Sequence, residues 1–104
     1  MKRIFQYDGV KPSTAQFAVQ VDLSSWLGTG ITIQTVSFSA KCLDDGTDAS
    51  TVVLDALKND YTTVIVRPWL KGGTSGKTYL VKMNVIGTNS YQDTFGLQFT
   101  VYDY

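Results

Sequence analysis

The stretch FGLQFTVY, Phe95 to Tyr102, alternates large apolar side chains with small or polar ones. In an extended chain, Phe95, Leu97, Phe99 and Val101 all point to one face. A half-buried β-strand has this period of two, whereas a helix repeats its apolar positions about every 3.6 residues. These residues therefore predict a strand that packs one face against a core.

Similar patterns predict six more strands along the chain. β-Branched residues are frequent in them, and such side chains fit a pleated strand better than a helix. A change of phase between Ile33 and Val36 predicts a β-bulge near Gln34 or Thr35. The one helical candidate, residues 50–58, contains several β-branched residues and is interpreted as a strand followed by a turn. The seven predicted strands are residues 3–7, 15–23, 31–40, 51–54, 62–69, 79–87 and 95–102.

The length of 104 residues, of which 43% are hydrophobic, suits one domain with a single core. All nine acidic residues are aspartate, which favours turns over helices. Short strands separated by turns at this spacing are typical of an immunoglobulin-like domain. We therefore predict an all-β protein, an immunoglobulin-like β-sandwich of about seven antiparallel strands, with residues 1–104 as its single domain. The two terminal strands are expected at sheet edges, where an open edge can pair with another chain or a second copy.

Tyr79 follows a glycine-rich turn that contains Gly72, Gly73 and Gly76. In immunoglobulin-like domains a tyrosine at the start of a late strand bonds back across the preceding turn, so a structural role is predicted for these four residues. The turn looks at first like a phosphate-binding loop. That pattern requires a glycine where Lys71 stands, and a helix where a strand is predicted.

Charge and hydropathy exclude several classes of partner. Nine basic residues balance nine acidic ones, and the absence of a basic excess argues against nucleic acid. No apolar run approaches the ~18 residues of a membrane-spanning helix. Residues 1–10 lack the apolar stretch of a signal peptide, so synthesis and initial retention in the cytoplasm are expected.

Catalytic groups are scarce in this sequence. It contains no histidine, the commonest general base and transition-metal ligand. The single cysteine, Cys42, cannot form an internal disulfide and is expected to be a small buried residue. We therefore predict neither an enzyme nor a bound cofactor.

Two groups of residues are candidates for ligand binding. Asp44, Asp45 and Asp48 offer oxygen ligands of the kind that calcium prefers, although their spacing matches no EF-hand loop and a solvated turn is the competing interpretation. Exposed aromatic residues can stack on sugar rings, and the candidates for such a platform are Trp26, Trp69 and Tyr91, with Tyr61, Tyr102 and Tyr104. The competing interpretation is that both tryptophans cover the core.

Two longer stretches carry a resemblance to a known family. Residues 19–40 contain the corner DLSSWLG (residues 22–28) followed by ITIQTV (residues 31–36), and residues 63–66, 70–81 and 99–101 match the family's second half. The chain resembles small immunoglobulin-like proteins encoded in the structural gene clusters of tailed phages and prophages.

The resemblance implies a non-enzymatic phage structural or accessory protein that is synthesised in the host cytoplasm and incorporated into the virion. Its expected partners are other phage structural proteins or a second copy of itself. The alternative that the residues leave open is a carbohydrate-binding or adhesion module that uses the exposed aromatic side chains.

Overall fold

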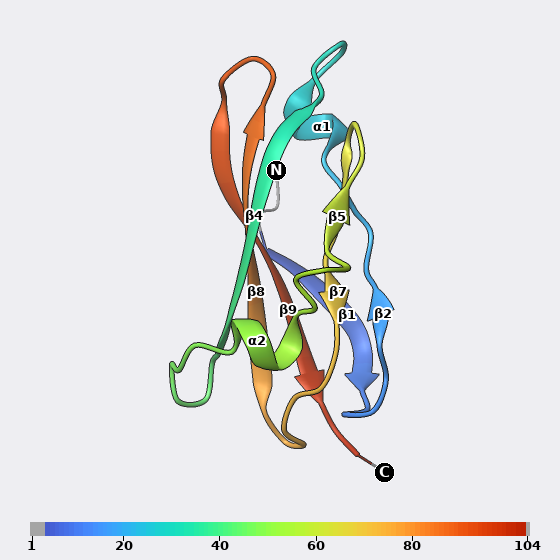
Figure 1. Ribbon diagram of the computed structural model, residues 1–104, viewed down its shortest axis with the longest axis vertical. Coiled ribbons are helices and arrows are strands. Elements are labelled where there is room, and N and C mark those ends of the chain that lie inside the picture. Colours follow the sequence, from blue (N-terminus) through green and yellow to red (C-terminus); the bar gives the residue numbers. More distant parts are fainter. Residues whose placement is uncertain (1–3, 104) are drawn as a thin grey trace.

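The computed structural model describes residues 4–103, and within them the side chains of residues 6–9 are not described. Arg3, the first residue of one predicted strand, and Tyr104, one of the aromatic candidates, lie outside the described residues. The described chain folds into nine strands and two short helices, so the all-β prediction is confirmed (Figure 1). The elements are β1 (Ile4–Lys11), β2 (Phe17–Ala18), β3 (Val21–Asp22), α1 (Ser24–Leu27), β4 (Ile33–Cys42), α2 (Ser50–Val53), β5 (Asp60–Tyr61), β6 (Ile65–Arg67), β7 (Trp69–Leu70), β8 (Thr78–Gly87) and β9 (Gln92–Val101).

The larger sheet has the strand order β1-β9-β8-β4. Strands β4, β8 and β9 are antiparallel neighbours, but β1 runs parallel to β9, which corrects the prediction of antiparallel strands throughout. The register of β4 against β8 shifts between Ile33 and Thr35, which confirms the predicted bulge. The prediction that residues 95–102 lie at an edge is wrong, because β1 pairs with the outer side of β9. The edges of this sheet are β1 and β4.

The second layer is made of short strands, in the pair β2-β7 and the three-stranded group β3-β6-β5. Phe17 pairs with Leu70, and Val21 pairs with Val66. The pairings β2-β7 and β3-β6 therefore continue one another in the same antiparallel register. The ladder is interrupted opposite Pro68, which has no N–H to donate, although its carbonyl accepts the N–H of Val19 at 3.1 Å. This interruption divides each of the predicted strands 15–23 and 62–69 in two.

Residues 51–54 were predicted as a strand, and this prediction is wrong because most of the segment belongs to helix α2. The N–H groups of Val52 and Val53 both donate to the carbonyl of Ala49 at 3.0 Å. The Asp48 carboxylate accepts the N–H of Ser50, and Val53 is completely buried. Local hydrogen bonds and the burial of Val53 outweigh the small helix penalty of β-branched residues, a few tenths of a kcal/mol each.

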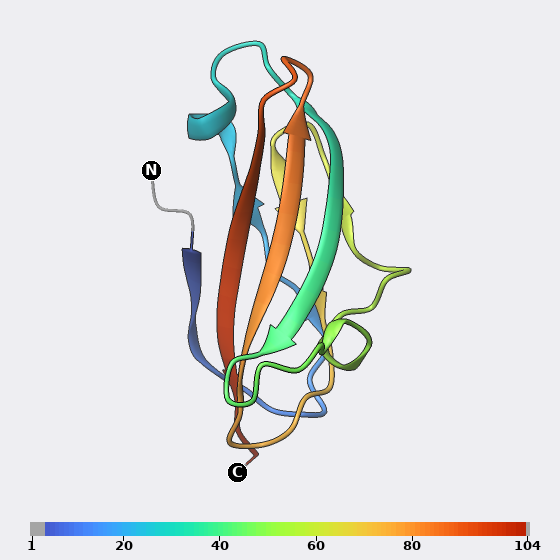
Figure 2. The same cartoon turned by 90° about the vertical axis from the view of Figure 1, so that its left-hand side faces the viewer.

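The core lies between the long sheet and the layer of short strands (Figure 2). Side chains from both layers fill it, and those fully buried include Leu23, Val66, Val81, Phe95 and Phe99. The alternation read from residues 95–102 therefore marks the buried face of β9. None of the helices in the described chain is long and apolar enough to cross a membrane.

A candidate protein-binding edge

The three aspartates that are candidates for calcium binding each bond to a different residue of the chain. Asp45 accepts hydrogen bonds from Thr47, and Asp48 accepts them from Ser50, which lowers the pKa of both carboxyl groups. Asp44 accepts the N–H of Thr78 at 2.8 Å. Over residues 4–103, no three His, Cys, Asp or Glu residues form a group that could hold a metal ion. The calcium-binding role of these residues stays a prediction.

The structure places Trp26, Trp69 and Tyr91 on different elements of the fold. Trp26 is half-buried and packs edge-on against Phe95, with ring centroids 5.2 Å apart. Tyr91 is 65% exposed beside the β8–β9 turn, at the same end of the molecule as α1 (Figure 1). Trp69 is half-buried in β7, where Lys58 Nζ lies 4.8 Å from the centroid of its ring. The sugar-binding role of these residues stays a prediction.

The glycine-rich turn lies between β7 and β8, and Tyr79 lies next to it at the start of β8. The buried Tyr79 hydroxyl accepts a hydrogen bond from the N–H of Thr74 at 2.8 Å, which is the contact across the turn expected from the sequence. Gly72, Gly73 and Gly76 all have positive φ. This turn is a structural element at one end of the sheet.

Lys11 was not singled out by the sequence, yet its side chain is fully buried. Its Nζ donates to the carbonyls of Pro12 at 2.9 Å and Gly72 at 2.8 Å, which joins the end of β1 to the glycine-rich turn. Burial lowers the pKa of Lys11 below its ordinary 10.5, and the nearby Asp103 carboxylate opposes that shift. A lone lysine between Val10 and Pro12 carries no sequence signal for this role.

Strand β4 is one of the two edges of the larger sheet, and its outer side lacks a continuous neighbour. At its far end, Ala40 donates its N–H to Ser50 Oγ at 3.0 Å and accepts the N–H of Ala49 at 2.9 Å. Near its beginning, the carbonyl of Gln34 accepts the Tyr61 hydroxyl at 3.2 Å. Between these two contacts lie Val36 and Phe38, whose side chains are half-buried.

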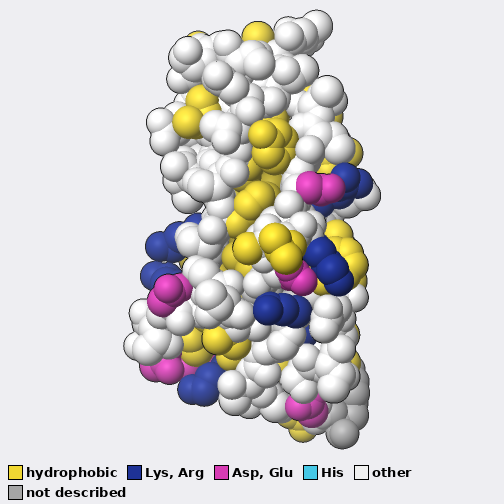
Figure 3. Space-filling model, in the orientation of Figure 1, with side chains coloured by type: hydrophobic (Ala, Val, Ile, Leu, Met, Phe, Trp, Pro, Cys, Tyr) yellow, Lys and Arg dark blue, Asp and Glu magenta, His cyan; other side chains and the backbone are white. Residues whose placement is uncertain are grey.

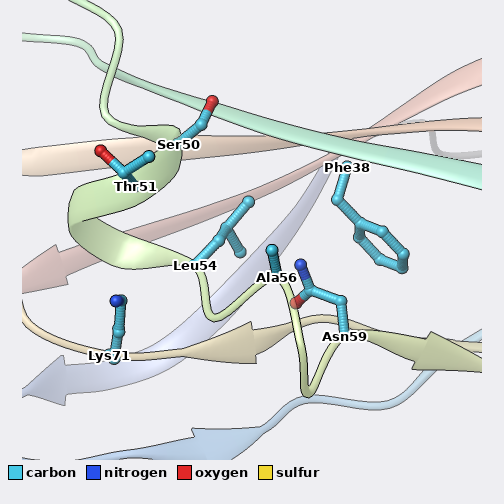
Figure 4. Close-up of a pocket in the computed structure, with 7 residues that line it drawn as sticks. All are labelled: Phe38, Ser50, Thr51, Leu54, Ala56, Asn59 and Lys71. Atoms are coloured by element: carbon cyan, nitrogen blue, oxygen red, sulfur yellow. The ribbon is translucent and has the colours of Figure 1, made fainter.

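A groove of about 230 Å³ adjoins this edge. The Phe38 ring forms one wall, α2 contributes another, and the segment after α2 forms the floor (Figure 4). Its lining residues are Phe38, Ser50, Thr51, Leu54, Ala56, Asn59 and Lys71. Hydrophobic side chains follow the seam between β4 and the opposite layer (Figure 3). Leu57, next to the lining residue Ala56, is 97% exposed, which is unusual for a leucine.

These features define a small, β-rich protein with an open strand edge beside an apolar groove. The family model Gp77, described as podophage GP4 fiber-tail adaptor protein gp77, matches residues 11–100. The chain belongs to this family. No curated protein matches the chain significantly.

A tail adaptor family is a structural, non-enzymatic kind of protein. The match therefore confirms the phage structural protein expected from the resemblance, and the corresponding prediction that the chain is not an enzyme agrees with it. The matched residues run from the end of β1 almost to the end of β9, so they include both layers of the fold.

Proposed function

We propose that this protein is a component of a podophage virion that joins the tail to a fibre by binding other phage structural proteins. The observation that carries the proposal is the family match over residues 11–100. The fold agrees with it, since a rigid β scaffold can hold partner-binding edges and loops in fixed positions. The chain is synthesised in the host cytoplasm, acts without a cofactor and does not bind nucleic acid.

We also propose that the two layers form a single immunoglobulin-like domain. Supporting this, β4, β8 and β9 lie in one sheet, whereas β3 and β6 pair in the other. In immunoglobulin folds, strands C, F and G likewise lie in one sheet, and strands B and E lie in the other. The Tyr79–Thr74 bond at the start of β8 also has the position of a tyrosine corner.

The proposed function is tested by disrupting the gene in the phage that encodes it. Particles would be purified, their proteins quantified by mass spectrometry, and their tails imaged by electron microscopy. We expect wild-type particles to contain the chain in a fixed ratio to the tail, and mutant particles to keep tails but lose fibres. A plasmid copy of the gene should restore them. Absence of the chain from wild-type particles, or normal fibres without it, would contradict the proposal.

A further inference from the structure

We propose that the outer edge of β4 pairs with an extended segment of another virion protein, which adds a strand to the larger sheet. This inference rests on the proposed function and specifies the surface and the kind of partner. The surface is the β4 edge from Thr35 to Ser39, together with the groove beside it, and is called the β4 acceptor edge below.

The hydrogen-bond pattern of β4 shows which backbone groups point outward. In an antiparallel pair, alternate residues direct both their N–H and C=O groups toward the neighbouring strand or away from it. Ala40 bonds to Ala49 and Ser50 on the outer side, so it directs its groups away from β8. Val36 and Phe38 share this phase with Ala40 across a regular register.

Within residues 4–103, no hydrogen bond joins the outward N–H and C=O groups of Val36 and Phe38 to another segment. Their two N–H and two C=O groups are therefore open to a partner. The flanking contacts, at Gln34 and Ala40, limit the open section to five residues. Strands rise about 3.3 Å per residue whichever chain they belong to, so the added strand has about the same number of residues as the open section, roughly four or five.

The groove determines the side chains that such a strand would carry. Alternate residues of an added strand would face Phe38, Leu54 and Ala56, which favours apolar side chains. Lys71 is the one charged residue among the lining residues, and within residues 4–103 it forms no ion pair. The partner is thus an extended apolar segment with an acidic side chain near Lys71.

A second copy of this chain fits the edge less well. In each copy, β4 is flanked by residues 47–50, which bond to Cys42 and Ala40. Helix α2 stands beside the same end of the strand (Figure 1). If two whole domains paired through their β4 edges, these segments of the two copies would clash. A free extended segment of another protein meets no such obstacle.

The first test measures binding to the separate components of the assembly. Purified chain would be titrated with fibre-less tails and with free fibres, both isolated from the gene-disrupted phage. Val36→Pro removes an outward N–H and leaves the bonds to β8, since Pro is tolerated at edge strands. We expect it to weaken binding about tenfold or more, the loss that corresponds to one hydrogen bond. Val36→Ala, which keeps the N–H, is the matched control and should bind more tightly than Val36→Pro.

Lys71 provides an independent test of the partner's charge. Lys71→Glu should weaken binding several-fold, whereas Lys71→Arg should retain it. Far-UV circular dichroism and thermal melting would establish that each variant is folded. Equal binding by folded Val36→Pro and Val36→Ala would overturn the proposal, as would unchanged binding by Lys71→Glu.

Hydrogen exchange of the wild-type chain tests the proposal without any substitution. The amides of Val36 and Phe38 should exchange rapidly in the free chain, and those of Ser37 and Ser39 slowly. Addition of the component that binds should protect Val36 and Phe38. If the chain binds without this protection, the edge proposal is wrong but the adaptor function stands. If neither tails nor fibres bind, the adaptor function itself fails. Concentration-dependent dimerisation that protects these amides would instead show a second copy as the occupant and overturn the partner proposed here.

Discussion

Gly73→Ala is expected to destabilise the protein markedly, because two costs coincide at this position. Gly73 has φ of +99°, a region that an L-residue occupies at a cost of about 1–2 kcal/mol. An added Cβ would also lie 2.7 Å from Val101 Cγ2 and 3.3 Å from Tyr79 Cε2. Val101 is fully buried, so relieving this overlap requires repacking that costs about 1–3 kcal/mol.

Gly76→Ala is the matched control in the same turn. Gly76 has φ of +87°, but an added Cβ there meets no atom within 4 Å. Only the backbone cost, about 1–2 kcal/mol, should appear. The gain from a less flexible unfolded chain is the same for both variants and cancels in their difference. Gly73→Ala should therefore be less stable than Gly76→Ala by about 1–3 kcal/mol.

Urea unfolding followed by tryptophan fluorescence measures this difference directly. Thermal melting provides a second measure, since 1 kcal/mol lowers the Tm of a domain of this size by roughly 4–8 °C. If the two variants are equally stable, or if Gly73→Ala is the more stable, the close packing of the turn against Val101 is refuted.

Three further predictions concern the same end of the molecule. Tyr79→Phe leaves the partly buried N–H of Thr74 without its acceptor and should lower the free energy of unfolding by about 1–2 kcal/mol in urea titrations; an unchanged value would contradict the structural role of the hydroxyl. Burial lowers the pKa of Lys11 in the folded state, so between that lowered pKa and 10.5 the unfolded chain binds more protons and the free energy of unfolding rises with pH. This rise should be absent from Lys11→Met in a series of unfolding curves, and an identical pH dependence of the two proteins would show that Lys11 is not the group responsible. Thermal melts with calcium and with chelator should superimpose, because the carboxylates of Asp44, Asp45 and Asp48 already accept hydrogen bonds from three different residues; a higher Tm with calcium would contradict this.

The features that the sequence predicts correctly depend on neighbouring residues. Strands β8 and β9 follow from alternation within each segment, and the bulge near Gln34 follows from a local change of phase. The bond between Tyr79 and Thr74 spans only five positions. Periodicity and turn chemistry are local properties, and they carry enough information for elements of this kind.

The features that the sequence does not predict depend on distant parts of the chain. Pro68 interrupts a ladder whose other strand lies about fifty positions earlier, at Val19. Lys11 is buried because its ammonium group reaches the carbonyl of Gly72, 61 positions away. The order of the strands, with β1 outside β9, is likewise a long-range result. No pattern within one segment contains these contacts.

The open edge of β4 and the incorrect strand at residues 51–54 have one physical origin. A strand in that segment could run beside β4 and satisfy the outward groups of Val36 and Phe38. Instead, the chain contacts Ala40, and the Asp48 carboxylate then binds the N–H of Ser50 as α2 begins. The helix directs the chain away from β4, and the groove forms in the space between them. The local hydrogen bonds that outweigh β-propensity in α2 therefore also leave the β4 acceptor edge without an internal partner.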